Sequence, residues 1–526
     1  IPDREKRIFI NPDVCEGCGD CAEKSNCVAI KPKEHFDGQK KQVDQSICNK
    51  DYSCIKGFCP SFISVSGIPK LNEDTKLFPS LPDTFKLLKK PKALTSDVNI
   101  VMAGIGGTGV STVSAIMVMA ARIDKKYSQS MNFTGLAQKN GAVTSQIRIS
   151  KNKTLYEKSA RLPNESAHLL LGCDAVVSVS PSITRTFNPI ITKAIINGRV
   201  EPIGVAGVHT GTTVDDQLLK KHLENHLDAN NLEFLDMSLL AEKLVGDTVS
   251  ANIMMIGYAS ERRLLPLSVN SLEKAIELNG VSIEQNLKAF NWGRLLAENK
   301  MNVFKYAGLI KNEKTKIDVK NEILKFRKIL TDYQDNDLAK SYENLINKLY
   351  LKEKKLFGNK KNFVLSRKAS RMLFRFMRYK DEYEVARLHT QTNFSKNFLN
   401  NNKNFKIEYY LAPPIFSFKD QSTGHPKKIK FGSWIILLFK ILSKFKFVRG
   451  SKFDIFGKTS ERKKERELAE KAKLSIKHIT ENLIDQNYRI CENLIDTSLK
   501  INGFGHVKDN KINQYESIWE DLLEKI

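Results

Sequence analysis

The residues most able to do chemistry are seven cysteines near the start of this 526-residue chain. They form two runs, Cys15-x2-Cys18-x2-Cys21 followed by Cys27, and Cys48-x2-Asp51-x2-Cys54 followed by Cys59-Pro60. Cysteines at this spacing wrap an iron–sulfur cluster, and in paired runs the last cysteine of each run binds the other cluster. The pattern therefore predicts two cluster sites, one of which has aspartate where a cysteine is expected.

The exchange of ligands between the runs assigns each residue to one site. Four cysteines are predicted to hold one four-iron–four-sulfur (4Fe–4S) cluster: Cys15, Cys18, Cys21 and Cys59. Four residues remain for a second cluster: Cys27, Cys48, Asp51 and Cys54. Five residues separate Cys21 from Cys27 and four separate Cys54 from Cys59. These longer gaps enlarge the loops and leave every ligand in place.

Asp51 leaves two interpretations open. An aspartate oxygen is a harder ligand than a thiolate and binds iron more weakly, so the second cluster could lose one iron and become 3Fe–4S. Alternatively, Asp51 is a solvated loop residue and the second cluster is absent. A disulfide framework fits poorly because the cysteine count in the segment is odd. Paired zinc sites fit poorly because they use separated C-x2-C pairs.

A second candidate site lies in a glycine-rich turn, Gly104-x-Gly106-Gly107-x-Gly109, between an expected strand and an expected helix. This context suits phosphate at a helix N-terminus. A dinucleotide site also needs an acidic residue about 20 residues further on, and the region around Met131 has none. Binding of NAD, an anion site for another cofactor and a purely structural turn all stay open.

A third stretch, Thr134 to Val143, supplies Gln138, Lys139 and Gly141 on one loop. Such a loop can meet an anionic ligand through its side chains and backbone amides, or it can be a surface hairpin.

Alternating apolar runs and helical patterns predict an α/β layered domain over residues 97–300. Strands are expected at 98–102, 145–149, 168–171, 175–177, 201–205 and 233–235, and a helix at 108–121. Residues 1–67 form the cysteine module and 68–96 a proline-bearing linker. Residues 301–526 are expected to be basic and mainly helical. The fold class is thus multi-domain α+β.

The net charge of +25 lies mostly after residue 300. We read this as a lysine-rich solvated surface, because no nucleic-acid-binding module is recognisable.

The apolar run 433–442 is too short to span a membrane and is expected to be a core or docking helix. With no targeting pattern, the chain is expected to be cytoplasmic. Its start at Ile1 favours a processed chain or a fragment of a longer polypeptide.

Several motifs together resemble one family. The cysteine runs resemble the ferredoxin segment of long, fused indolepyruvate ferredoxin oxidoreductases, and Gly104–Gly109 with Thr134–Lys139 resembles their gamma-type domain. Asn140 stands where that family often has glycine, a mild departure because asparagine tolerates left-handed backbone. Further similar stretches run to the C-terminal end: 379–387, 411–414, 449–454 and 503–507.

The resemblance implies CoA-dependent oxidative decarboxylation of aryl 2-oxoacids, with electrons passed to ferredoxin. The thiamine-diphosphate signature of the family is absent, so the chain resembles the C-terminal half of the enzyme. It would need a thiamine-diphosphate-binding half, and a homo-oligomer is expected. The alternative is a non-catalytic iron–sulfur carrier or redox scaffold, although such a carrier needs no α/β companion domain of this size.

The aspartate in the second run generates the first prediction. Protein prepared without oxygen should be brown and carry one stable and one labile cluster, and Asp51→Ala should lower the iron content toward about four atoms per chain. Iron analysis of both proteins measures this. About four atoms in the unmodified chain, with no loss in the variant, would remove the support for a second cluster.

Overall fold

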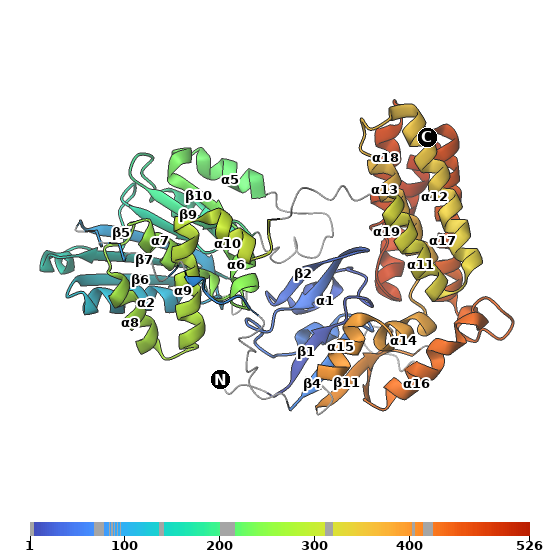
Figure 1. Cartoon of the computed structure of the whole chain (residues 1–526), viewed down its shortest axis with the longest axis horizontal. Helices are drawn as coiled ribbons and strands as arrows, with labels where there is room; N and C mark the ends of the chain where they lie inside the picture. The colour runs from blue at the N-terminus through green and yellow to red at the C-terminus, as the bar shows by residue number, and fades with distance from the viewer. Residues whose placement is uncertain are drawn as a thin grey trace.

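The computed structural model describes residues 5–67, 78–83, 85, 88, 90–91, 93–94, 96–135, 141–199, 216–310, 319–401, 405–413, 424 and 426–526. The chain is a multi-domain α+β protein with an α/β part on one side and a helical part on the other (Figure 1). The cysteine segment lies between them. No helix within the described ranges has the length and apolar character needed to cross a bilayer.

The α/β part is built on a mixed six-stranded sheet in the order β10-β9-β8-β5-β7-β6. Strands β10, β9, β8 and β5 are parallel, whereas β5, β7 and β6 pair antiparallel. Their bounds are Val98–Ile105 (β5), Tyr127–Thr134 (β6), Ala142–Ser150 (β7), Leu169–Gly172 (β8), Lys193–Asn197 (β9) and Leu232–Leu235 (β10).

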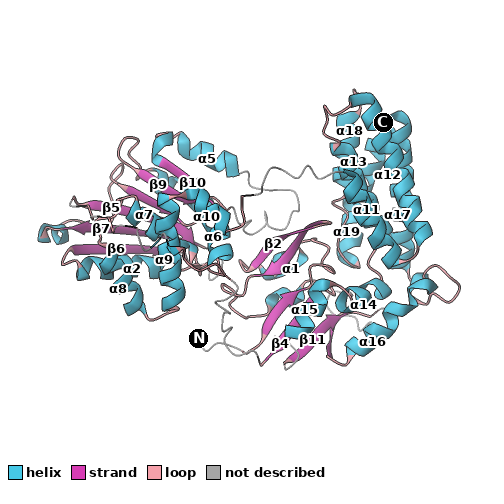
Figure 2. Cartoon of the chain, viewed as in Figure 1, coloured by secondary structure: helices cyan, strands magenta, loops and turns pink. Residues whose placement is uncertain are grey.

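Helices cover both faces of this sheet (Figure 2). Alternate residues of β5 enter two different cores, with Ile100 and Met102 on one side and Val101 and Ala103 on the other. Burial on both faces explains the unbroken apolar run in this strand. One core is closed by α2 (Val110–Ile123), α6 (Met237–Leu244), α7 (Ala251–Glu261), α8 (Val269–Asn279), α9 (Ile283–Glu298) and α10 (Lys300–Tyr306). The other is closed by α3 (Ala175–Ser178), α4 (Pro181–Thr184) and α5 (Asp216–Glu224).

Most of the expected elements are confirmed, and one is wrong. The strands expected at 98–102, 145–149, 168–171 and 233–235 correspond to β5, β7, β8 and β10, and the helix expected at 108–121 is α2. The expected strand 175–177 is helix α3. Asp174 caps this helix by accepting a hydrogen bond of 2.8 Å from the Val177 amide, and the cap outweighs the β preference of the valines. The expected strand at 201–205 lies outside the described residues.

The cysteine segment contains β1 (Arg7–Ile10), α1 (Asp20–Ser25), the hairpin β2 (Ile30–His35) and β3 (Gly38–Val43), and β4 (Phe62–Ser66). Strand β1 pairs with β4, and β4 then pairs with β11 (Lys406–Leu411), which pairs with β12 (Ile429–Gly432). All three pairings are antiparallel. A sheet begun near the N-terminus is therefore completed by strands more than 330 residues later, which periodicity could not predict.

The rest of the C-terminal part is helical. Helices α11 (Val319–Tyr333), α12 (Asn336–Phe357), α13 (Val364–Met377), α17 (Ser460–Asn482), α18 (Tyr488–Ser498) and α19 (His506–Glu524) share one core. Near its centre, Phe326 and Phe374 stack with their ring centroids 4.2 Å apart. Helices α14 (Glu382–Thr390), α15 (Asn393–Asn401) and α16 (Ile435–Leu442) lie beside the cysteine segment instead (Figure 1).

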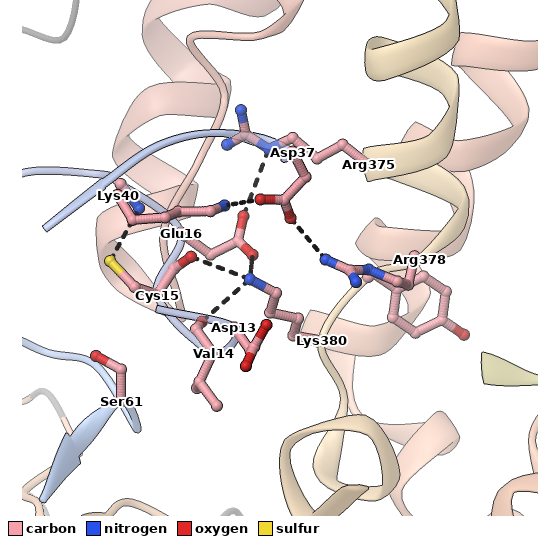
Figure 3. A network of polar contacts seen from close by, with 12 residues as sticks. Asp13, Val14, Cys15, Glu16, Asp37, Lys40, Ser61, Arg375, Arg378 and Lys380 are labelled. Carbon is pink, nitrogen blue, oxygen red and sulfur yellow. Dashed lines mark hydrogen bonds and ion pairs between the residues drawn. The ribbon is translucent and has the colours of Figure 1, made fainter. Parts of the chain in front are cut away.

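Buried ion pairs fasten the helical part to the cysteine segment (Figure 3). The Lys380 ammonium lies 2.7 Å from the Glu16 carboxylate, and Arg378 lies 2.7 Å from Asp37. Burial alone would raise the pKa of Glu16, but Lys380 and Arg375 hold it far below its usual value. Lys380 also donates to the carbonyl oxygens of Val14 and Cys15, at 3.2 and 3.0 Å. One lysine thus fixes the loop that carries the first cysteines.

This lysine generates the second prediction. Lys380→Met should lower the free energy of unfolding by about 3–5 kcal/mol, because Glu16 is left buried without its main partner. Urea unfolding of the intact chain measures the loss. The matched control is Lys430→Met, whose exposed ammonium lies 3.3 Å from Glu408 and should contribute about 0–1 kcal/mol. Equal losses in the two variants would contradict the central role of Lys380.

Candidate functional site

The first cysteine group gathers from two distant parts of the cysteine segment. Cys15, Cys18 and Cys21 lie on the loop after β1 and at the start of α1, whereas Cys59 lies just before β4. All four are buried, and none is in a disulfide. Burial raises the pKa of the Cys21 thiol well above its usual value, and the other three thiols raise it further. The four sulfur atoms are therefore electrostatic neighbours.

The local backbone supports this arrangement. The Gly17 amide donates to the Cys15 sulfur at 3.3 Å. Gly17 has a φ of +72°, and a Cβ at this position would lie 2.2 Å from the Gln39 carbonyl oxygen. Only glycine can make this turn without displacing β3. At the other end of the group, the Cys59 sulfur lies 2.8 Å from the Ser61 hydroxyl.

The second group is closer to the surface. Cys54 is buried, Cys27 and Cys48 are half-buried, and Asp51 is exposed. Burial raises the pKa of Cys54 to about 12, and the charges of Cys48, Cys27 and Asp51 add to the rise. Cys54 thus has as neighbours the three residues that the spacing groups with it: Cys27, Cys48 and Asp51.

Asp51 already has a local role. One of its carboxylate oxygens accepts hydrogen bonds from the Ser53 amide at 3.0 Å and the Ser53 hydroxyl at 2.8 Å. This contact shapes the turn that presents Cys54. Both interpretations of Asp51 are compatible with this geometry, and its ligand role stays a prediction.

The two cysteine groups suit an iron–sulfur cluster better than a single metal ion. Within the described residues, no three His, Cys, Asp or Glu side chains converge on a point that could hold one metal ion. Iron–sulfur clusters are larger and take their thiolate ligands around a periphery. Burial raises the pKa of the Cys18 and Cys21 thiols against the opposing effect of nearby lysines, and bound iron would supply further positive charge. The four buried cysteines therefore fit one cluster, and a second cluster at Cys27, Cys48, Asp51 and Cys54 stays a prediction.

The C-terminal part supplies cations around the first group. Lys511 donates to the Cys18 carbonyl oxygen at 3.0 Å, and Lys428 donates to the Gly57 carbonyl oxygen. Burial lowers the pKa of Lys428 to about 8, against the opposing effect of the nearby Cys59 and Cys21 thiols. The sequence alone did not indicate that Lys428 and Lys511 lie beside the first cysteine group. For Lys380 there was an indication, because it lies in the family-like stretch 379–387.

A second family-like stretch, 503–507, packs against the cysteines. A Cβ at Gly503 would lie 3.4 Å from the Cys18 Cβ, and Phe504 shares a core with Cys15 and Cys59. These stretches carry no metal-binding pattern of their own, so only their spatial position reveals what they contact.

The glycine loop joins β5 to α2. A Cβ at Gly104 would lie 2.7 Å from the Val110 side chain and 3.0 Å from the Cys173 Cβ, so this glycine serves close packing. Gly107 is exposed, has a φ of +89° and leaves open space beside it. The Gly106 amide donates to the Gly141 carbonyl oxygen at 2.8 Å, which brings the two predicted loops together. Gln138 and Lys139 lie outside the described residues.

The sheet order argues against a dinucleotide site at this loop. In a dinucleotide fold, the strand that follows the first helix lies parallel beside the first strand. Here β6 follows α2 and pairs antiparallel with β7. The neighbours of β5 are β8 and β7.

The glycine loop faces the cysteine segment across a small cavity of about 40 Å³. Ile105, Thr108 and Arg199 line one side, and Lys31 and Ile47 line the other. Lys31 pairs with Asp44 at 3.3 Å, and Asp44 accepts a hydrogen bond of 2.7 Å from Thr248 in the α/β part. The two parts are therefore joined by polar contacts at this junction.

Comparison with known proteins now defines the class of the α/β part. Residues 99–296 match the family described as pyruvate ferredoxin/flavodoxin oxidoreductase, and residues 321–521 match a family of unknown function, DUF6537. The α/β part is similar to the first of these families and to the indolepyruvate oxidoreductase subunit IorB.

Two relatives show the extent of this similarity. IorB of Pyrococcus horikoshii is 24% identical over 211 residues, covering 39% of this chain and 99% of the relative. IorB of Archaeoglobus fulgidus is 25% identical over 205 residues, covering 37% of this chain and 93% of the relative.

Two solved structures resemble the chain more weakly. The pyruvate oxidoreductase subunit PORC of Thermotoga maritima is 19% identical with a TM-score of 0.28, covering 38% of this chain and 96% of PORC. A 2-oxoglutarate:ferredoxin oxidoreductase of Magnetococcus marinus is 16% identical with a TM-score of 0.28, covering 39% of this chain and 32% of that one. At these scores the likeness carries no argument. Neither family match reaches residues 1–67.

The exchanged grouping of the cysteines generates the third prediction. Cys15→Ser and Cys59→Ser should each weaken the same EPR signal of the reduced protein, because their sulfur atoms belong to one group although they lie 44 residues apart (59 − 15). Cys48→Ser is the control and should alter the other signal. Different signals lost in the first two variants would overturn the assignment.

Proposed function

We propose that this chain is the electron-transfer and gamma-domain portion of an indolepyruvate, or aryl 2-oxoacid, ferredoxin oxidoreductase. The observation that carries the proposal is the grouping of Cys59 with the first cysteine run and of Cys27 with the second, directly beside a gamma-type domain. Exchange of this kind is the mark of a two-cluster ferredoxin-like module, which we assign to residues 1–67.

Each group has its own role in the proposal. Cys15, Cys18, Cys21 and Cys59 hold a 4Fe–4S cluster in a buried site, where water has little access. Cys27, Cys48 and Cys54, with Asp51, hold a second cluster that is more exposed and loses iron more readily. When bound, such clusters carry electrons one at a time between the oxidised 2-oxoacid and ferredoxin.

Charged and polar groups of this chain lie beside the first cysteine group and would affect its reduction. Lys380, Lys428 and Lys511 place positive charge near the first group, which stabilises the added negative charge of a reduced site. The Gly17 amide also stabilises negative charge, because it donates a hydrogen bond to the Cys15 sulfur. Hydrogen bonds to cluster sulfurs are one of the means by which proteins set reduction potential.

The gamma-type domain frames the reaction site at the junction. Gly104, Gly106, Gly107 and Gly109, with Gln138, Lys139 and Gly141, are the residues that we assign to an anionic cofactor, for which CoA is the candidate. Open backbone at Gly107, near the start of α2, supports this role. Arg199 and Lys31, which line the adjoining cavity, add positive charge.

The carbon chemistry requires a partner. Oxidative decarboxylation releases carbon dioxide, transfers the acyl group to CoA and yields two electrons, which two ferredoxin molecules accept singly. Thiamine diphosphate supplies this chemistry when bound to the partner half. The proposal therefore includes that half and a ferredoxin as partners, with a homo-oligomer as the assembled state.

Activity of the assembled enzyme gives the fourth prediction. The isolated chain, even with thiamine diphosphate added, should not reduce a low-potential dye in the presence of indolepyruvate and CoA. Mixing with the thiamine-diphosphate-binding half should restore substrate-dependent reduction, which dye absorbance follows. Turnover by the isolated chain would reveal a cofactor site in it. No turnover by the mixture, from a chain loaded with iron, would favour a redox scaffold.

A further inference from the structure

A buried histidine of the C-terminal part contacts both ends of the first cysteine group. His389 lies near the end of α14 and is 1% exposed. Its Nε2 lies 2.9 Å from the carbonyl oxygen of Pro60, the residue after Cys59. Its Nδ1 lies 3.3 Å from the side-chain nitrogen of Asn11, at the start of the loop that carries Cys15. One imidazole thus connects two segments that are far apart in the sequence.

The partners of this imidazole fix its protonation. A carbonyl oxygen only accepts hydrogen bonds, so Nε2 carries a proton and donates it to Pro60. Two neighbours orient the Asn11 amide: its oxygen accepts from the Asp13 amide at 3.0 Å, and its nitrogen donates to the Leu388 carbonyl oxygen at 3.2 Å. Because that nitrogen is only a donor, Nδ1 of the imidazole accepts from it. Burial favours the same neutral form, since it lowers the pKa of His389 to about 4.

Asn11 extends the connection to both cysteines. Its backbone carbonyl oxygen accepts a hydrogen bond of 3.0 Å from the Cys15 amide, and its backbone amide donates to the Ser61 carbonyl oxygen at 2.8 Å. The Ser61 hydroxyl in turn lies 2.8 Å from the Cys59 sulfur. Asn11 therefore binds the segment that leads to Cys15 and the segment that follows Cys59.

The surroundings hold the His389 ring in one position. The ring stacks on Phe439 of α16, with centroids 5.5 Å apart and planes 10° apart, and it meets the edge of Tyr409 in β11 at 5.1 Å. Asn11 is fully buried as well. In a site closed to water, a broken hydrogen bond leaves a buried polar group without a partner, so the observed arrangement is strongly preferred.

The fourth cysteine of the first group needs such a contact more than the other three. Cys15, Cys18 and Cys21 lie on one short stretch of chain, whereas Cys59 reaches the group from the far end of the cysteine segment. Groups that orient the ligands of a metal centre also tune the properties of that centre.

We propose that His389 is a positioning residue that sets Cys59 against the Cys15 loop and thereby tunes the reduction potential of the first cysteine group when it holds a cluster. This proposal rests on the proposed function, because it takes the first group to be a redox site. It adds that the C-terminal part acts on that site through a neutral histidine, besides the charge of Lys380. His389 acts through Pro60 and Asn11, and its ring takes no part in the electron transfer itself.

Two variants of the full chain, prepared without oxygen, test this role. His389→Phe keeps an aromatic ring for stacking but loses both hydrogen bonds. His389→Gln places an amide nitrogen close to the position of Nε2 and so keeps a donor for Pro60. His389→Phe should raise the midpoint potential of the EPR signal that Cys15→Ser weakens, because a looser site admits water that stabilises the reduced state. It should also release iron to a chelator about tenfold faster. His389→Gln should restore both properties, and the signal altered by Cys48→Ser should keep its potential throughout.

Hydrogen exchange of the same variants gives a measurement that does not depend on iron. The amides of Asn11 and Cys15 should exchange about tenfold faster in His389→Phe and more slowly again in His389→Gln. Asn11→Ala breaks the connection from the other side while its own backbone hydrogen bonds can still form. It should move the same potential and the same exchange rates, and it provides the test where His389→Phe does not fold.

A matched control separates positioning from stability. Tyr488→Phe also loses two buried hydrogen bonds, because the Tyr488 hydroxyl donates to Glu353 at 2.8 Å and accepts from the Leu365 amide at 3.2 Å in the helical core. It should destabilise the chain and leave both potentials unchanged. An equal shift of potential in this control would overturn the positioning role, and so would an unchanged potential in both His389→Phe and Asn11→Ala, even with faster exchange. An unmodified, iron-loaded chain without a reducible EPR signal would instead overturn the proposed function.

Discussion

Burial of the first cysteine group is the constraint on which much of this structure depends. A segment of about sixty residues has too much surface for its volume to enclose such a site alone. The C-terminal part completes the enclosure with two strands, β11 and β12, and with residues 503–507. The same part supplies Lys380, whose ammonium pairs with Glu16 and donates to two carbonyl oxygens of the cysteine loop. The described C-terminal part therefore packs over the cysteine segment and completes the burial of the first cysteine group.

The electrostatics follow from that enclosure. A buried carboxylate is costly unless it is paired, and Glu16 and Asp37 are paired with Lys380 and Arg378. The thiols beside them lie near Lys428 and Lys511, but burial outweighs these cations and raises the pKa of Cys18 to about 11. The site therefore suits a ligand that brings further positive charge. This is consistent with the iron–sulfur site that the cysteine spacing predicts.

Sequence reasoning succeeded where periodicity carries the information. The apolar run at 98–102 predicted the strand that is β5, whereas the two cysteine groups that the spacing predicts stay a prediction as cluster ligands. It failed at Ala175–Ser178, where one aspartate cap outweighs β preference. It also could not foresee that β11 extends the sheet begun by β1 and β4, because strand pairing over such a distance leaves no periodic signal. Lys428 and Lys511 were missed for a related reason, since an isolated lysine gains meaning only from what it contacts.

The basic character of the C-terminal part also changes meaning once the residues are placed. As composition, the excess of lysine indicates a solvated surface, and exposed residues such as Lys452 fit that description. Lys380 is different because it is buried against backbone carbonyls of the cysteine loop. Lys440 and Lys444 form a third class, because they flank apolar side chains that nothing in the described chain covers. Net charge alone does not distinguish these three kinds of lysine, whereas the burial and the neighbours of each lysine do. Lys380 is thus part of the surroundings of the cysteine loop, whereas Lys440 and Lys444 are exposed beside apolar side chains, a distinction that composition does not make.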